Sequence, residues 1–194
     1  MTDPGTRDLL PNLTTLKVES SRVNMQFLRY VRARSPLRNL SVRRSSLGHH
    51  ILFYDSLPPP PPQRNTVKLL KVLDISQTGE YSLKVLNEWV FNDDQCQVTH
   101  LFMEHCPVLP RAVPAHVKIE FLSVAGYNAG SLGQYSAECT FLDIEAWAAI
   151  PSIREINASG SNLNQVQRDE LVTTHPNVEF DLSEDFRESP RNFI

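Results

Sequence analysis

The stretch Leu70-Lys71-Val72-Leu73-Asp74-Ile75-Ser76-Gln77-Thr78 contains the pattern that decides the fold. Apolar residues occupy its first, fourth and sixth positions, and a hydroxyl residue follows three positions after the last of them. Apolar residues at alternate positions are typical of a short β-strand that buries one face. The hydroxyl side chain can bond backbone groups at the turn that follows the strand. The stretch therefore predicts a strand that ends in a tight, internally bonded turn.

The same hexapeptide, apolar-x-x-apolar-x-apolar, recurs along the chain. Its units are 13–18, 37–42, 70–75, 98–103, 119–124 and 153–158, and we expect a seventh to start at Val178. With 41% apolar residues, chance alone places the pattern in about 7% of windows, so the positions that follow must decide.

Two further positions repeat with the hexapeptide. The residues three places after the unit are Ser21, Ser45, Thr78, Cys106 and Ser161, and the fifth unit has Tyr127. The residues five places after it are Val23, Leu47, Val108, Ala129 and Leu163, and the third unit has Glu80. Successive units start 24, 33, 28, 21, 34 and 25 residues apart. This is a repeat with two insertions.

The combined pattern resembles the leucine-rich repeat, L-x-x-L-x-L-x-x-N/C-x-L, in its ribonuclease-inhibitor-like or cysteine-containing subclass. The resemblance implies an α/β fold. It would be a solenoid with a parallel sheet on the concave face and helices or irregular segments on the convex side. We expect a disordered segment at 1–8, a repeat domain of six to seven units at 9–185 with a proline-rich insertion at 57–65, and a tail at 186–194.

Several return segments predict helices. Asn24 can cap a helix that runs to about Arg34, and Ser82 can cap another over Leu83–Phe91. Asn164 and Gln167 form a capping-box pattern that predicts a third helix. The segment from Glu138 to Ile150 is apolar. Trp89 and Trp147 are expected to fill the core on the helical side.

Strand geometry then predicts a binding face. Side chains between the buried positions point outward along the concave sheet, and we expect Val72, Phe102 and Phe121 to form an exposed apolar strip with His100 beside it. The alternative is that a neighbouring segment covers the strip, or that the frame is shifted by one residue and buries it. The proposed partner-binding residues are Lys17, Arg43, Val72, Asp74, His100, Phe102, Glu104, Phe121 and Glu155.

The expected function is binding of a protein partner without catalysis. The chain contains no glycine-rich phosphate loop and no motif of the common hydrolases or kinases. We expect neither a cofactor nor a metal, since Cys106 is already explained as a turn residue of the repeat and Cys96, His100 and His105 then form no metal set. The family resemblance extends to substrate receptors of cullin ubiquitin ligases, which makes an adaptor role an expectation by analogy.

Charge is distributed unevenly. Residues 1–50 have a net charge of +6, whereas residues 138–194 have −7. The alternative function is a nucleic-acid or anionic-surface binder that uses the arginine-rich first repeats. The pI of about 6.1 and the lack of interleaved aromatics argue against it. The spacing of Arg29 and Arg32 predicts a solvated helix face instead.

Partners and location complete the expectations. The run Pro58–Pro62 predicts a polyproline II loop that either is a tolerated insertion or contacts an SH3, WW or profilin-like domain. No secretory signal and no membrane-length apolar run are present. Three cysteines do not make a disulfide framework, so a cytoplasmic or nuclear protein without membrane contact is expected.

Overall fold

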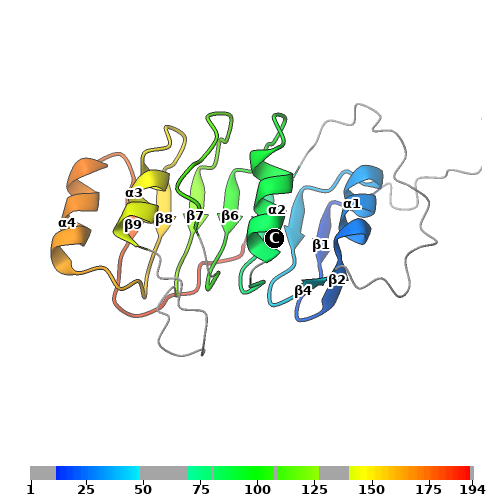
Figure 1. Ribbon diagram of the computed structural model, residues 1–194, viewed down its shortest axis with the longest axis horizontal. Coiled ribbons are helices and arrows are strands. Elements are labelled where there is room, and N and C mark those ends of the chain that lie inside the picture. The colour runs from blue at the N-terminus through cyan, green and yellow to red at the C-terminus, as the bar shows by residue number, and fades with distance from the viewer. Residues whose placement is uncertain (1–11, 49–69, 80, 107–108, 127–139, 193–194) are drawn as a thin grey trace, which may run out of the picture.

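The structure is a computed structural model that describes residues 12–48, 70–79, 81–106, 109–126 and 140–192. It contains a seven-stranded sheet with helices on one side (Figure 1). The expected disordered segment at 1–8, the insertion at 57–65 and its prolines Pro58–Pro62 lie outside the described residues. The described part is a mixed α/β structure, as the sequence predicts.

Each hexapeptide supplies one strand of the sheet. The strands are β1 (Thr15–Lys17), β3 (Asn39–Ser41), β5 (Val72–Asp74), β6 (His100–Phe102), β7 (Phe121–Ser123), β8 (Glu155–Asn157) and β9 (Glu179–Asp181). They pair in this order, and every pair is parallel. Parallel neighbours in chain order need a return segment between each pair of strands, so the long spacings between hexapeptides become the layer beside the sheet.

The register confirms six of the seven frames and corrects the last. Each of the first six strands starts two residues after its hexapeptide begins. In the seventh unit Glu155 pairs with Glu179, and Ile156 with Phe180. The unit therefore starts at Asn177 rather than at Val178. The apolar Val178 misled the prediction because the true first position is polar, and the inward positions are Phe180 and Leu182.

The helices follow the return segments. They are α1 (Met25–Arg34), α2 (Tyr81–Leu86), the π-helical turn η1 (Asn87–Phe91), α3 (Phe141–Ala148) and α4 (Gln165–Thr174). Asn24 caps α1 by accepting a hydrogen bond from the Gln26 amide, and Asn164 forms the expected capping box with Gln167. The prediction for Ser82 is wrong: Ser82 lies inside α2, where its hydroxyl donates to the Gly79 carbonyl.

A second, small sheet follows the first two turns. It consists of β2 (Arg22–Asn24) and β4 (Ser46–Gly48), which pair in parallel. Both strands come five to seven residues after the main strands of their units. The first two units therefore pair twice: through β1 and β3 before the turn, and through β2 and β4 after it.

One apolar core fills the space between the sheet and the helices. The middle residue of each of the strands β3 to β8 is completely buried, as are Trp89 and Trp147, which confirms both tryptophans as core residues. Trp147 also donates its indole N–H to the Pro110 carbonyl at 2.7 Å. Burying such a side chain contributes a few kcal/mol, so the two tryptophans stabilise the helical layer.

A left-handed residue ends each of the first six units. Its φ is 52° at Ser20, 57° at Arg44, 59° at Gln77, 53° at His105, 72° at Gly126 and 68° at Gly160. Each of these residues comes two places after the last apolar residue of its hexapeptide. The backbone turns sharply there, and in four of these units the next side chain donates to a backbone carbonyl, as expected. Ser21 donates to the Glu19 carbonyl of its own turn. Ser45 donates to the Val18 carbonyl, while Thr78 and Cys106 donate to the Ile75 carbonyl.

A candidate binding face

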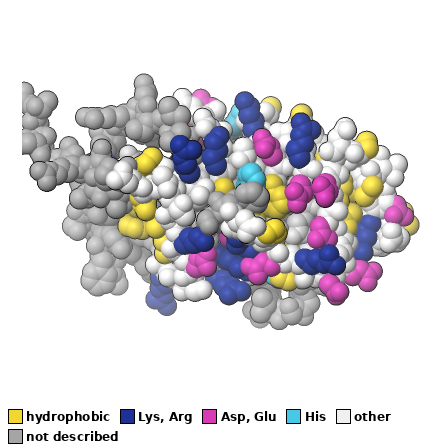
Figure 2. All heavy atoms as spheres, turned by 180° about the vertical axis from the view of Figure 1, so that it is seen from behind, with side chains coloured by type: hydrophobic (Ala, Val, Ile, Leu, Met, Phe, Trp, Pro, Cys, Tyr) yellow, Lys and Arg dark blue, Asp and Glu magenta, His cyan; other side chains and the backbone are white. Residues whose placement is uncertain are grey.

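The sheet has a face that carries none of the described helices. We call it the helix-free face. Its side chains are the first and third residues of each strand, because residues alternate between the two faces of a strand. The residues that follow the strands, such as Arg43 and Glu104, extend the same rows. Seen from behind, basic and acidic side chains are interspersed there with apolar ones (Figure 2).

The expected apolar strip forms, but it is buried rather than exposed. Val72, Phe102 and Phe121 pack together, and the Phe102 and Phe121 ring centroids are 5.2 Å apart. Their exposed fractions are only 4%, 0% and 7%. The His100 ring stacks on Phe121, and a guanidinium lies over Phe102. The prediction of exposure is wrong because residues from the far end of the chain lie on this face.

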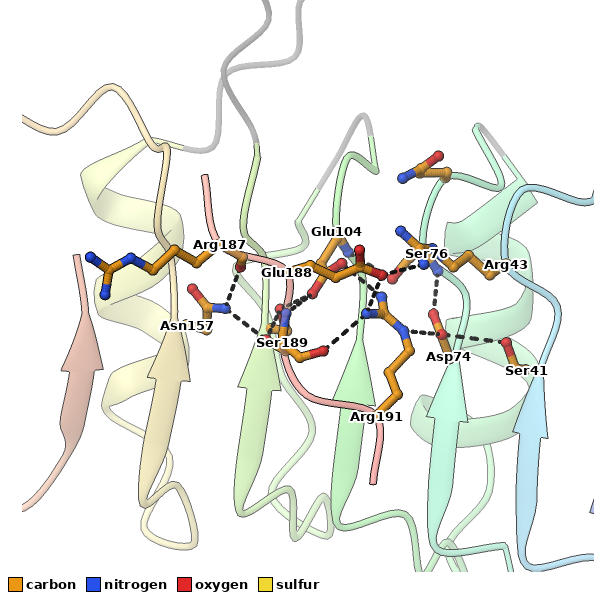
Figure 3. A network of polar contacts seen from close by, with 12 residues as sticks. Ser41, Arg43, Asp74, Ser76, Glu104, Asn157, Arg187, Glu188, Ser189 and Arg191 are labelled. Carbon is orange, nitrogen blue, oxygen red and sulfur yellow. Dashed lines mark hydrogen bonds and ion pairs between the residues drawn. The ribbon is translucent and has the colours of Figure 1, made fainter. Parts of the chain in front are cut away.

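Those residues belong to the segment 183–192, which we call the covering segment. It follows β9, contacts Asn157 in β8 and runs in front of β7 and β6, and the Arg191 side chain extends from it to Asp74 in β5 (Figure 3). At its first contact with the face, the Arg187 carbonyl accepts hydrogen bonds from Asn157 Nδ2 at 3.0 Å and from the Ser159 hydroxyl at 3.2 Å. The Arg187 amide donates to the same hydroxyl at 2.9 Å. The contacts of Arg187 with β8 are therefore made by its backbone.

In the middle of the face, Ser189 joins a chain of hydrogen bonds. Asn157 Nδ2 donates to Ser189 Oγ at 2.6 Å, Ser189 Oγ donates to Ser123 Oγ at 2.9 Å, and Ser123 Oγ donates to Glu104 Oε1 at 2.8 Å. The Ser189 amide also donates to Glu104 Oε1, at 3.1 Å. All four residues are buried. Such linked bonds strengthen one another where water is excluded.

Arg191 completes the network between two carboxylates. Its Nη2 donates to Glu104 Oε2 at 2.7 Å and its Nε donates to Asp74 Oδ2 at 2.9 Å. The side chains of Asp74 and Glu104 are completely buried, and Arg191 is 15% exposed. The guanidinium carbon lies 5.3 Å from the centre of the Phe102 ring. Two buried carboxylates need such a cation, because an uncompensated buried charge is strongly destabilising.

The covering segment also reaches the basic half of the chain. Arg43 forms an ion pair with Glu188, and Glu188 in turn accepts from Arg191 Nη1 at 2.8 Å. Asp74 is held from the other side by the Ser41 hydroxyl at 3.3 Å. The positive and negative regions identified in the sequence therefore meet on this face.

The structure brings together most of the predicted partner-binding residues. Arg43, Asp74, Phe102 and Glu104 contact the covering segment, and Val72, His100 and Phe121 form the aromatic cluster beside it. Lys17 and Glu155 are exposed on separate strands, β1 and β8, outside this network.

Sequence reasoning missed part of the residues that bind the covering segment, and it missed the segment itself. Ser123, Asn157 and Ser159 lie in the outward rows of the sheet, but small polar residues there carry no distinguishing pattern. Ser189 and Arg191 lie in the stretch interpreted as a tail. The signal that could have found them is the pair Asp74 and Glu104: two carboxylates in neighbouring outward rows of a crowded sheet require a basic residue from elsewhere.

Two of the arginines proposed for the alternative function, Arg29 and Arg32, have carboxylate partners. Arg29 forms a bidentate pair with Glu88, and Arg32 bonds Asp93 at 2.6 Å and lies over the Trp89 ring. The Glu88 pKa is lowered, chiefly by the hydrogen bond from Arg29. Arg29 is exposed, in agreement with the predicted solvated face. The prediction is wrong for Arg32, which is partly buried because Asp93, shortly after η1, pairs with it.

Cys106 and His105, considered above as metal ligands, make other contacts. The Cys106 thiol donates to the Ile75 carbonyl, and burial raises its pKa to about 11. The His105 ring packs on Phe186, with 4.8 Å between ring centroids. Among the described residues no three His, Cys, Asp or Glu side chains are placed to hold a metal ion. No helix in the described ranges is long and apolar enough to cross a membrane.

Comparison of the chain with family models, curated proteins and solved structures finds no match.

Proposed function

We propose that this chain is a leucine-rich-repeat-like solenoid that binds a protein partner, without catalysis, through its helix-free face. By analogy with the family it resembles, it would act as the substrate-recognition or adaptor part of a larger assembly such as a ubiquitin ligase, in the cytoplasm or nucleus. The partner would contact Lys17 and Glu155 and the rows of side chains between them.

The repeat supports the fold part of the proposal. Parallel strands that pair strictly in chain order, a left-handed residue at the same place in six units and side chains that bond backbone inside the turns are what stacked repeats require. Each unit then contacts its neighbours on either side. An extended array of this kind presents one continuous face, which suits recognition of a macromolecule.

One observation carries the functional part: an extended segment already lies across the helix-free face and is held there by side chains of several strands. Asn157, Ser123 and Glu104 bind it at successive positions. A face that hydrogen-bonds an extended backbone and also reads charged side chains has what peptide recognition needs.

Photo-crosslinking tests the proposal. The variants Lys17→p-benzoylphenylalanine and Glu155→p-benzoylphenylalanine place the crosslinker at exposed positions of the helix-free face. Irradiation in an extract of the source cells should yield discrete products with a partner protein. The same products should be absent with Gln26→p-benzoylphenylalanine in α1 and Glu170→p-benzoylphenylalanine in α4, which are exposed on the helical side.

Identical products from both sides of the molecule would contradict the proposal, because the partner would then not distinguish the helix-free face. Products that disappear on nuclease treatment would contradict it too, since they would identify the partner as a nucleic acid.

A further inference from the structure

We infer that the helix-free face recognises an arginine within an extended protein segment, and that the covering segment holds this place in the chain itself. The inference rests on the proposed function and specifies the chemistry of the partner. Its central element is the guanidinium site formed by Asp74, Glu104 and Phe102, which Arg191 fills.

The geometry of this site selects a guanidinium. Asp74 belongs to β5 and Glu104 follows β6, so the two carboxylates come from adjacent strands. Arg191 bonds one through Nε and the other through Nη2, while its guanidinium carbon lies over the Phe102 ring. A planar fork with several donors can make these contacts together, whereas an ammonium group is a single compact point of charge. A lysine would satisfy the site less well.

Groups of the sheet itself orient both carboxylates. Asp74 Oδ1 accepts from the Ser76 amide at 3.0 Å, and Glu104 Oε1 accepts from the Ser123 hydroxyl at 2.8 Å. Both carboxylates therefore have a hydrogen bond from residues of the sheet in addition to those from the covering segment, so part of the site's shape comes from the sheet itself (Figure 3). A preorganised site loses little entropy when it binds a ligand.

The covering segment buries little of itself. Of residues 184–192 only Ser189 is buried, and Phe186 is 41% exposed. Arg187 is bound through its backbone carbonyl and amide, groups that almost any peptide possesses. The side chains of the segment that make contacts are those of Phe186, which packs on the His105 ring, and of Glu188, Ser189 and Arg191. A segment held by few side chains, with little apolar burial, belongs to the least stable parts of a fold. Another segment with an arginine at the same place can replace it.

Tethering sets how strongly a partner must compete. A short intramolecular link gives an effective concentration in the millimolar range, and the apparent affinity for a partner falls by the fraction of molecules in which the site is open. A partner that binds in the micromolar range once the site is open therefore appears much weaker to the intact chain.

The test measures binding of a fluorescein-labelled peptide with the sequence of residues 185–192 to the full chain by anisotropy. The Arg191→Gln chain, which cannot fill its own site, should bind the peptide at least about tenfold more tightly than the unaltered chain does. Peptides that carry Arg191→Gln or Arg191→Lys should bind this chain at least about tenfold more weakly. A peptide with Arg187→Gln should bind like the parent, because it has the same charge change at a residue bound through its backbone.

Two further chains test the site itself. Adding Glu104→Gln to the Arg191→Gln chain should remove peptide binding, whereas adding Glu170→Gln on α4 should leave it unchanged. Circular dichroism identifies any variant that has lost its fold. A Ser189→Ala chain, which removes only a hydroxyl from the covering segment, serves as a second, milder way to loosen the segment and should also bind the peptide more tightly than the unaltered chain.

Equal binding of the arginine and glutamine peptides, or no binding to either loosened chain, would overturn the inference. If crosslinking at positions 17 and 155 still captured a partner, the proposed function would stand and only the arginine would be wrong. The inference would also be overturned if the unaltered chain formed a dimer and Arg191→Gln abolished it. The site would then bind a second copy of this chain.

Discussion

At the scale of single residues, the buried carboxylates Asp74 and Glu104 dominate the helix-free face. Their sequence positions alone suggest exposed acids on a solvated sheet. In the structure both are completely buried, and Arg191 supplies the positive charge. The usual expense of burying a charge is offset because hydrogen bonds from Ser41, Ser76 and Ser123 occupy further lone pairs of the two carboxylates.

Removing the cation should therefore be strongly destabilising. We expect Arg191→Gln to lower the free energy of unfolding by about 2–3 kcal/mol, because both carboxylates lose their charged partner. Arg187→Gln makes the same change in the same segment at an exposed residue and should stay within about 0.5 kcal/mol of the unaltered chain. Urea titrations followed by circular dichroism measure both values. Equal effects would mean that the guanidinium site contributes nothing special to stability.

His105 gives this molecule a pH dependence of known sign. Burial lowers its pKa, with smaller opposing effects from Glu104 and the Gly126 backbone. The unfolded chain, with a histidine pKa of about 6.5, then takes up the proton more readily than the folded chain. The contribution of His105 to stability is complete above pH 7.5 and is lost as the pH falls through about 6.5 toward the folded pKa.

Replacing this histidine should flatten the pH profile. In His105→Asn, where asparagine tolerates the left-handed backbone, the free energy of unfolding should fall less between pH 7.5 and 5.5 than in the unaltered chain. The His105→Asn chain should still lose some stability at acid pH, because burial also lowers the pKa of His100. Urea titrations at several pH values test this. The change from pH 7.5 to 8.5 should be the same in both chains, and equal acid slopes would contradict the prediction.

At the scale of elements, the turn after each strand is the repeated device. Six turns use a left-handed residue, but only two of the six are glycine, so no glycine pattern reveals them in the sequence. At Gly126 the requirement is double, because φ is 72° and an added Cβ would overlap the His105 ring of the preceding turn. At Gly79, with φ of 64°, nothing lies within 4 Å of such an atom. A substitution at Gly79 therefore adds backbone strain alone, whereas one at Gly126 adds strain and a steric clash.

Alanine substitution should rank these two positions. Gly79→Ala should lower stability by about 1 kcal/mol, because an L-residue is strained in this conformation. Gly126→Ala should lower it by at least about 1 kcal/mol more, since the His105 ring must also move from its contact with Phe186. Thermal and urea unfolding of both variants give the comparison. Equal losses would show that the ring moves aside freely.

At the scale of the whole molecule, the covering segment links units that are far apart in the sequence. It joins Asn157 in the sixth unit to Asp74 in the third and, through Glu188, to Arg43 in the second. Stacked units otherwise contact only their neighbours, and such arrays can unfold in parts. The segment should therefore make the two halves of the sheet unfold as one.

The two tryptophans report on the two halves. Trp89 lies in η1 and Trp147 in α3, so the variants Trp89→Phe and Trp147→Phe each leave one probe. With the covering segment intact, urea midpoints measured by fluorescence should coincide with those measured by circular dichroism. After Arg191→Gln is added, the urea midpoints of the two probes should differ, and the dependence of the unfolding free energy on urea concentration should become less steep. Midpoints that stayed together would show that the segment does not couple the halves.

The sequence by itself determined the strands, the caps at Asn24 and Asn164 and the buried tryptophans, because each depends on neighbours within a few residues. Its errors were also local: the polar Asn177 hid the start of the last unit, and Ser82 resembles a cap although the helix begins before it. Only the tertiary structure decided which surface the solvent meets. Arg191 and Asp74 are 117 residues apart, and no local periodicity encodes a contact between two segments whose relative positions are set by all the units stacked between them.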